Sequence, residues 1–319
     1  MQNIIILLLV IISQAHTYSQ NLTKEKIKTI IYSIPELIES NYVDKEKGKQ
    51  IAIDFKHEMN SGKYYSIRNS DTLVNVLSKD LKRISKDGHM YINHLKASDT
   101  KTAGTKDWEA QEKALEIKLN YGFTEIQILE NNTGYIKIVE FMQPKRSMQT
   151  AVAAMKMVEN TENLIIDIRD NGGGYPGVLE YIINHYFDGP PTLLSTTYFS
   201  DPKMTAYTKY TSDLVYGKLR IGKPLYILIN GNTGSASEYF AYTLQAFGKA
   251  IIIGEKSAGS AHNNEYFSLS DNFRISISTA MPVNEITKTN WERKGVIPDV
   301  NVKSESAKKK AIEIILNKK

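Results

Sequence analysis

The sequence contains no cysteine. Disulfides, a thiol nucleophile, a thiolate metal site and lipid attachment through an N-terminal cysteine are therefore excluded. The sequence also has little excess of one sign of charge, because 40 basic and 35 acidic residues leave a formal net charge of +5. The basic cluster Lys308–Lys310 is short. This mixed surface gives little reason to expect nucleic acid or a membrane as partner. Stability has to come from packing, and a chain of 319 residues that is 41% hydrophobic can bury a sizeable core.

Long apolar runs are scarce as well, and the run at Ile4–Ile12 is too short to span a bilayer. It has the length of a signal-peptide h-region, although no Lys or Arg precedes it. Small residues follow, and cleavage after Ser19 or Ala15 would suit a signal peptidase. We predict a signal peptide over residues 1–19 and export to the periplasm or the exterior, without stable membrane insertion. The alternative is a buried first strand or helix.

The chain also lacks a phosphate-binding loop. Gly172–Gly174 fit neither the spacing of a P-loop nor that of a dinucleotide-binding turn. Glycines let backbone amides approach a ligand closely, which suits an oxyanion hole, and they also suit a simple tight turn. No nucleotide cofactor is expected.

Two regions differ in their apolar pattern. From Asn21 to about Ser98 the pattern is typical of helices, with Leu73, Leu77 and Leu81 at helical spacing, and we expect the helix to break at Gly88. The polar, small residues 97–107 are the best candidate linker. We predict an N-terminal helical domain over 20–106 and a core domain over 107–319.

The core domain has the pattern of an α/β fold. A buried strand at 164–168 is followed by a glycine turn and a helix near 178–187, and the same order recurs at 224–247. Further elements are predicted as hairpins at 123–141 and 265–280, a helix at 147–158, a strand at 250–255 and a terminal helix at 305–317.

The second strand-turn-helix unit contains Gly234-Ser235-Ala236-Ser237-Glu238. A serine on such a turn lies beside the unpaired first amides of a helix, which can face a developing oxyanion. That is the position of a serine nucleophile. The alternative is a Gly/Ser loop in which Ser235 only caps the helix.

Several motifs together resemble serine peptidase family 41, the C-terminal processing or tail-specific peptidases. The matching segments are Leu164–Gly174, Thr233–Glu238, Gly254-Glu255 and Gly295–Val300, and the resemblance covers nearly all of the mature chain. It implies a spiral core like that of crotonase and ClpP. No PDZ-like insertion is evident between the two regions.

The chain departs from the Ser-Lys branch of this family, whose base is a lysine within Gly-Lys-Gly, because the matching segment here is Ser257–His262. It is more similar to the branch that includes the tricorn core and the repeats of interphotoreceptor retinoid-binding protein. In tricorn-like enzymes the triad is Ser, His and Glu, which implies Ser235 as nucleophile, His89 as general base and Glu292 as the carboxylate that orients the imidazole. Those enzymes carry a serine directly before the histidine, where this chain has Gly88.

The same resemblance implies that the amides of Ala236 and of Gly173 or Gly174 form the oxyanion hole. His262 is the alternative base, since it lies on the segment where the other branch carries its lysine. Glu238 could either enter the site or support the loop of Ser235. No metal and no cofactor are implied.

The predicted function is that of an exported serine endopeptidase that cleaves peptides, unfolded protein or C-terminal segments, with a homo-oligomer left open. One alternative is a non-catalytic module for apolar ligands, as in the retinoid-binding repeats. Another is an acyl-CoA-handling enzyme with paired backbone amides, which export disfavours.

Overall fold

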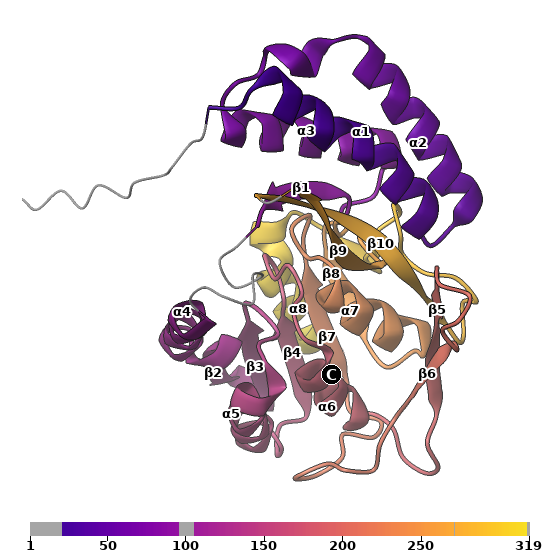
Figure 1. Cartoon of the computed structure of the whole chain (residues 1–319). Helices are drawn as coiled ribbons and strands as arrows, with labels where there is room; N and C mark the ends of the chain where they lie inside the picture. Colours follow the sequence, from indigo (N-terminus) through magenta and orange to yellow (C-terminus); the bar gives the residue numbers. More distant parts are fainter. Residues whose placement is uncertain (1–20, 96–104, 271, 318–319) are drawn as a thin grey trace, which may run out of the picture.

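The computed structural model describes residues 21–95, 105–270 and 272–317. Three helices, α1 (Lys24–Asn41), α2 (Lys45–Asn60) and α3 (Ser70–Ser85), form a layer over one end of the molecule (Figure 1). Each begins where an N-cap side chain, of Thr23, Asp44 or Asn69, accepts a hydrogen bond from a first-turn amide. The helical prediction for this region is confirmed.

The helical layer packs on a small antiparallel sheet that joins distant parts of the chain. Its strand order is β1-β10-β5-β6, with β9 also paired to β10. The strands are β1 (Tyr91–His94), β5 (Leu193–Phe199), β6 (Tyr207–Tyr210), β9 (Asn263–Ser270) and β10 (Phe273–Asn284). Ile275 and Ile277 of β10 share one apolar core with helices α1 to α3.

A second sheet forms the centre of the rest of the molecule. Its order is β11-β8-β7-β4-β3-β2, and every pair is parallel except the β2–β3 hairpin. The strands are β2 (Phe123–Leu129), β3 (Thr133–Ile138), β4 (Asn163–Asp167), β7 (Leu225–Ile229), β8 (Ile251–Gly254) and β11 (Val300–Asn301).

Helices cover both faces of this sheet, as its uninterrupted apolar strands require. Helices α5 (Pro144–Met157), α6 (Pro176–Asn184) and α7 (Ala236–Ala246) pack on one face, and α8 (Ala307–Asn317) packs on the other. The remaining helical segments are α4 (Thr105–Lys118) and the short turns η1 (Lys63–Ser66), η3 (Asn120–Gly122), η4 (Glu130–Asn132) and η5 (Ser304–Ser306). Because β4 and β7 are parallel neighbours, their carboxyl ends lie side by side.

The predicted α/β class, both hairpins and the two strand-turn-helix units are confirmed. The β5–β6 hairpin was not anticipated. No PDZ-like insertion occurs in the described ranges. The predicted signal peptide and most of the 97–107 linker lie outside the described residues. The domain division near residue 106 stays a prediction, although β1 from one side of it pairs with β10 from the other.

The shared core of β10 and the helical layer can be tested with Ile275→Ala. Ile275 is fully buried, so we expect the free energy of unfolding in urea to fall by about 3 kcal/mol. The control is Ile128→Ala on the surface of β2, where the side chain is 51% exposed and the expected loss is below about 1 kcal/mol. Equal losses in the two variants would contradict the shared core.

Candidate active site

Ser235 lies at the turn between β7 and α7, in a backbone conformation that is rare for a residue other than glycine. Its φ is 52° and its ψ is −119°. Such a conformation persists only where the surroundings enforce it, and it is typical of a nucleophile presented on a strand-to-helix turn. The backbone conformation of Ser235 thus differs from that of an ordinary helix cap, although Ser235 and Glu238 also form a capping box.

The Glu238 carboxylate holds this turn against a second loop. It accepts hydrogen bonds from the Ser235 amide at 2.9 Å and from the Ser260 amide at 2.9 Å. It also accepts from the Gly259 amide at 2.6 Å and the Ser257 hydroxyl at 2.5 Å. Burial raises the pKa of Glu238, and these hydrogen bonds oppose the rise. Of the two roles considered for Glu238, these contacts are those of a support for the loop.

The turn of Ser235 is also bound to the loop that follows β4. The Gly234 amide donates to the Asn171 carbonyl at 3.0 Å, and the Thr233 hydroxyl donates to the Ile168 carbonyl at 2.9 Å. This places the glycines beside the serine: a Cβ on Gly173 would lie 2.9 Å from both the Ala236 nitrogen and the Ser235 Cβ. Only a glycine allows this approach.

The amides predicted for an oxyanion hole differ in their partners. Gly173 donates its N–H to the Asn171 side chain at 2.9 Å. Within the described residues, the amides of Gly174 and Ala236 have no acceptor, and both residues line a cavity with Ser235. In this conformation, the two amides free to meet an oxyanion are those of Gly174 and Ala236.

A second cluster brings together Asp87, His262 and Glu292. His262 Nδ1 lies 3.1 Å from Asp87 Oδ2 and 3.7 Å from Glu292 Oε2. Glu292 Oε2 also accepts the backbone amides of Ala261 at 2.7 Å and His262 at 3.2 Å. Asp87 was not predicted as a site residue, although its place two residues before His89 was a usable signal.

The pKa values of the two carboxyl groups in this cluster are shifted in opposite directions. Burial opposes ionisation of Asp87, but the hydrogen bond and charge of His262 lower the pKa of Asp87 to about 2. Burial and the charge of Asp87 raise the pKa of Glu292 to about 7. Asp87 is also the acceptor for the Tyr42 hydroxyl at 2.9 Å, whereas Glu292 Oε1 is buried without a partner.

His89 lies at the edge of the same cluster. Its backbone N–H donates to Asp87 Oδ1 at 2.9 Å, and its side-chain Nδ1 is buried without a hydrogen-bond partner. Burial lowers the pKa of His89, the charge of Asp87 opposes this, and the charge of His262 adds to it. The imidazole is therefore neutral at pH 7, which is the form a general base needs.

The loop of Ser260 connects the histidines to Ser235. Ser260 shares the Glu238 carboxylate with Ser235, and a Cβ on Gly88 would overlap the Ser260 hydroxyl. The Ser260 hydroxyl thus fills the space that a side chain at position 88 would need. Among the described residues, no hydrogen bond joins Ser235 to His89 or to His262. Catalytic contacts are often longer in unliganded sites, so this leaves both histidines as candidates.

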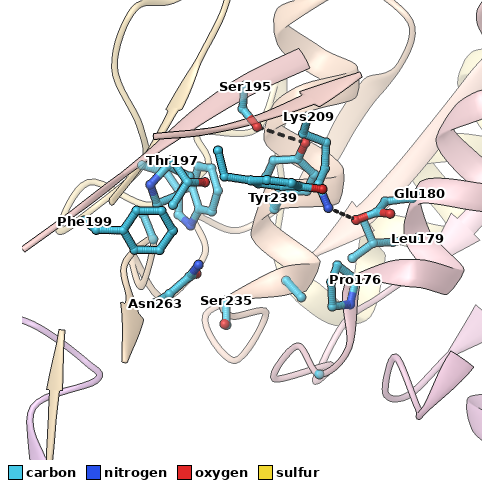
Figure 2. A pocket seen from close by; sticks show the side chains of 16 residues that line it. Pro176, Leu179, Glu180, Ser195, Thr197, Phe199, Lys209, Ser235, Tyr239 and Asn263 are labelled. Atoms are coloured by element: carbon cyan, nitrogen blue, oxygen red, sulfur yellow. Dashed lines mark hydrogen bonds and ion pairs between the residues drawn. The ribbon is translucent and has the colours of Figure 1, made fainter. Parts of the chain in front are cut away.

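A cavity of about 320 Å³ opens beside Ser235. Figure 2 shows Ser235 at its edge, with Pro176 and Leu179 of α6 on one side and Thr197, Phe199 and Asn263 on the other. A strained serine at the amino end of a helix, two amides beside it and an adjoining cavity are features of one class of protein, the serine hydrolases.

Comparison with known families identifies the particular group. Residues 132–302 match the profile of peptidase family S41, and residues 20–128 match the N-terminal domain of peptidase S41 in eukaryotic IRBP. The first match covers more than half of the chain, so the protein belongs to peptidase family S41. The family prediction and its IRBP-related N-terminal region are confirmed.

Individual relatives share only about a quarter of their residues with this chain over the aligned part. The chain is 27% identical over 169 residues to carboxyl-terminal-processing peptidase 3 of Arabidopsis thaliana chloroplasts, covering 53% of this chain and 31% of the relative. It is 27% identical over 201 residues to a carboxy-terminal-processing protease of Bartonella bacilliformis, covering 60% and 44%. The chain thus spans less than half the length of these relatives.

Among solved structures, a Parabacteroides merdae protein described as a peptidase shares the fold. The TM-score is 0.61 at 18% identity, with 93% of this chain and 98% of that chain covered.

Within the part of the chain that the structure describes, no helix is long and apolar enough to cross a membrane.

The role of Glu238 can be tested with Glu238→Gln. In this variant an NH₂ group replaces one accepting carboxylate oxygen and would face hydrogen-bond donors. We therefore expect the free energy of unfolding to fall by about 2 kcal/mol. Urea unfolding measures this loss. Glu305→Gln, at an exposed position, is the control and should change stability by less than about 0.5 kcal/mol. A Glu238→Gln variant as stable as the control would rule out the supporting role.

Proposed function

We propose that the protein is an exported serine endopeptidase that cleaves peptides or unfolded chains, including C-terminal segments, through an acyl-enzyme. The observation that carries the proposal is the strained Ser235 beside the unpaired amides of Gly174 and Ala236. Membership of family S41 supports it, as do the relatives named as C-terminal processing peptidases. The apolar run at Ile4–Ile12 supports export.

In the proposed reaction, Ser235 Oγ attacks the scissile carbonyl while its proton passes to a histidine. The oxyanion accepts hydrogen bonds from the Gly174 and Ala236 amides, each worth about 3 kcal/mol in the transition state. The C–N bond then breaks, and the histidine returns the proton to the leaving amine. Water, deprotonated by the same histidine, hydrolyses the ester and frees Ser235.

We assign the base to His89 and its orienting carboxylate to Glu292. Support comes from two buried atoms without partners, His89 Nδ1 and Glu292 Oε1, because one can donate the hydrogen bond that the other can accept. His89 contacts Asp87 through its backbone amide and Glu292 lies beside His262, so pairing them requires the two side chains to move together on substrate binding. The Ser260 hydroxyl, placed over Gly88, would supply the auxiliary hydroxyl that tricorn-like enzymes carry before the histidine.

His262 is the rival base, because its Nδ1 already contacts a carboxylate, that of Asp87. This contact leaves Nε2 as the atom that would accept the serine proton. The two assignments use different carboxylates and can be separated by mutation.

Labelling with a fluorophosphonate probe tests nucleophile and base together. We expect an adduct on Ser235 in the wild-type protein, none in Ser235→Ala, and labelling slowed by about 10³-fold or more in His89→Ala, because the serine loses its base. His262→Ala should slow labelling by no more than about 10-fold. Mass spectrometry locates the adduct, and digestion of unfolded casein by the same variants reports peptidase activity.

Circular dichroism of each variant controls for folding. Loss of labelling in His262→Ala with retention in His89→Ala would transfer the role of base to His262. A folded wild-type protein that forms no adduct and cleaves no casein would overturn the peptidase assignment. Saturable binding of an apolar ligand by that protein would favour the second candidate, a non-catalytic binding module, which the match to the IRBP domain supports.

The pH dependence of kcat/KM reports on Glu292. Its carboxylate must be ionised to stabilise the imidazolium, and its pKa is raised to about 7, so activity should fall as the pH drops through about 7. His89 has a lowered pKa and does not set this limit. In Glu292→Gln we expect kcat/KM to fall by about 10³-fold and its acid limb to move below pH 6.5. An unchanged acid limb in this variant would contradict the role of Glu292.

A further inference from the structure

The cavity beside Ser235 lies between helices that cover the central sheet and a hairpin of the antiparallel sheet. Helices α6 and α7 provide Leu179, Glu180 and Tyr239, and the β5–β6 hairpin provides Phe199 and Lys209 (Figure 2). With about 320 Å³, it can hold a large side chain. Ser235, Ala236 and Gly174 line the same cavity, so a group inside it is adjacent to the nucleophile and to the free amides.

The position of the cavity assigns it to the acyl side of the scissile bond. The leaving amine takes its proton from a histidine and must therefore depart toward the histidine cluster. Neither His89 nor His262 lines the cavity, although Ala261 and Asn263 beside His262 do. Gly174 and Ala236, whose amides are proposed for the oxyanion hole, also line it. The cavity thus receives the side chain of the residue whose carbonyl is attacked, the P1 residue.

The walls of the cavity are mainly apolar and aromatic, with Leu179, Phe199, Tyr239 and Trp291 among them. Trp291 packs against Tyr239, with the ring centroids 6.1 Å apart, and the Tyr239 hydroxyl is hydrogen-bonded to Ser195 at 3.2 Å. The aromatic surface is therefore held in place by contacts of its own. It matches a bulky apolar side chain better than a small one.

The charged side chains in the cavity, Lys209 and Glu180, form an ion pair with each other. This pair joins β6 to α6 along the cavity wall, so each charge already has a counter-ion (Figure 2). A charged P1 side chain would lose its hydration without gaining a counter-ion. The pair thereby selects against both acidic and basic residues.

We propose that this cavity is the S1 pocket, which receives the P1 side chain, and that it selects large uncharged residues such as Phe, Tyr, Leu and Met. In this proposal the Lys209–Glu180 pair excludes charged P1 residues. The inference rests on the proposed peptidase function. Since a single methylene in an apolar pocket changes kcat/KM by about 10-fold or more, Phe should exceed Ala at P1 by about 100-fold.

The test uses peptides that differ only at P1, with Phe, Leu, Ala, Glu or Lys, and maps the cleavage sites in unfolded casein by mass spectrometry. Wild type should cleave after Phe and Leu. Lys209→Met leaves the Glu180 carboxylate unpaired and should raise kcat/KM for Lys at P1 by about 10-fold. Glu180→Gln leaves Lys209 unpaired and should raise it for Glu by a similar factor.

Glu285→Gln is the matched control, because it breaks an ion pair with Lys288 that lies outside the cavity lining. It should leave the P1 profile unchanged. Wild-type cleavage with no P1 preference, a preference for Ala, or ion-pair variants that fail to shift in opposite directions would overturn this proposal. A wild-type protein that cleaves nothing and takes no label on Ser235 would instead overturn the proposed function.

Discussion

The candidate active site depends on one buried carboxylate, that of Glu238. It gathers the amides of Ser235, Gly259 and Ser260 and the hydroxyl of Ser257, so two loops that follow different strands are held at a single point. A buried carboxylate without such donors would cost several kcal/mol. The four hydrogen bonds therefore explain both why Glu238 can be buried and why Ser235 can keep a strained backbone.

The same loop connects the core to the N-terminal layer. Ser260 lies against Gly88, and the pairing of β1 with β10 carries residues 87–89 to this place. Asp87 and His89 are contributed by the chain segment between α3 and β1, whereas His262 and Glu292 come from the C-terminal part. The candidate site therefore combines residues from two distant parts of the chain, and the segment that follows α3 contributes one half of it.

Local patterns were enough to predict most elements from the sequence. Apolar runs marked β4 and β7, a glycine or small-residue turn followed each, and the parallel order placed both turns at one edge of the sheet. The turn of Ser235 was recognisable for the same reason. The β5–β6 hairpin was missed because its strands are half exposed and lie between polar loops, so they lack a clear alternation.

Contacts between distant residues could not be predicted in this way. Nothing local indicates that His262 lies 3.1 Å from Asp87, because that distance depends on how β10, β1 and the loop after β8 pack. The position of Glu238 one helical turn after Ser235 was visible, but its four donors come from two loops. The cavity likewise depends on a hairpin that the sequence did not reveal.

The charges around His262 show why the helical layer matters for chemistry as well as for packing. Two carboxyl groups compete for one imidazole, and Asp87 holds the advantage because the Tyr42 hydroxyl and the His89 amide also donate to it. Glu292 has amide donors on one oxygen only and keeps the other unpaired. Since like charges in one site push their pKa values apart, the ionised Asp87 leaves Glu292 as the group that titrates near neutrality. Tyr42, the C-cap residue of helix α1, thus donates a hydrogen bond to the carboxylate that contacts both His89 and His262.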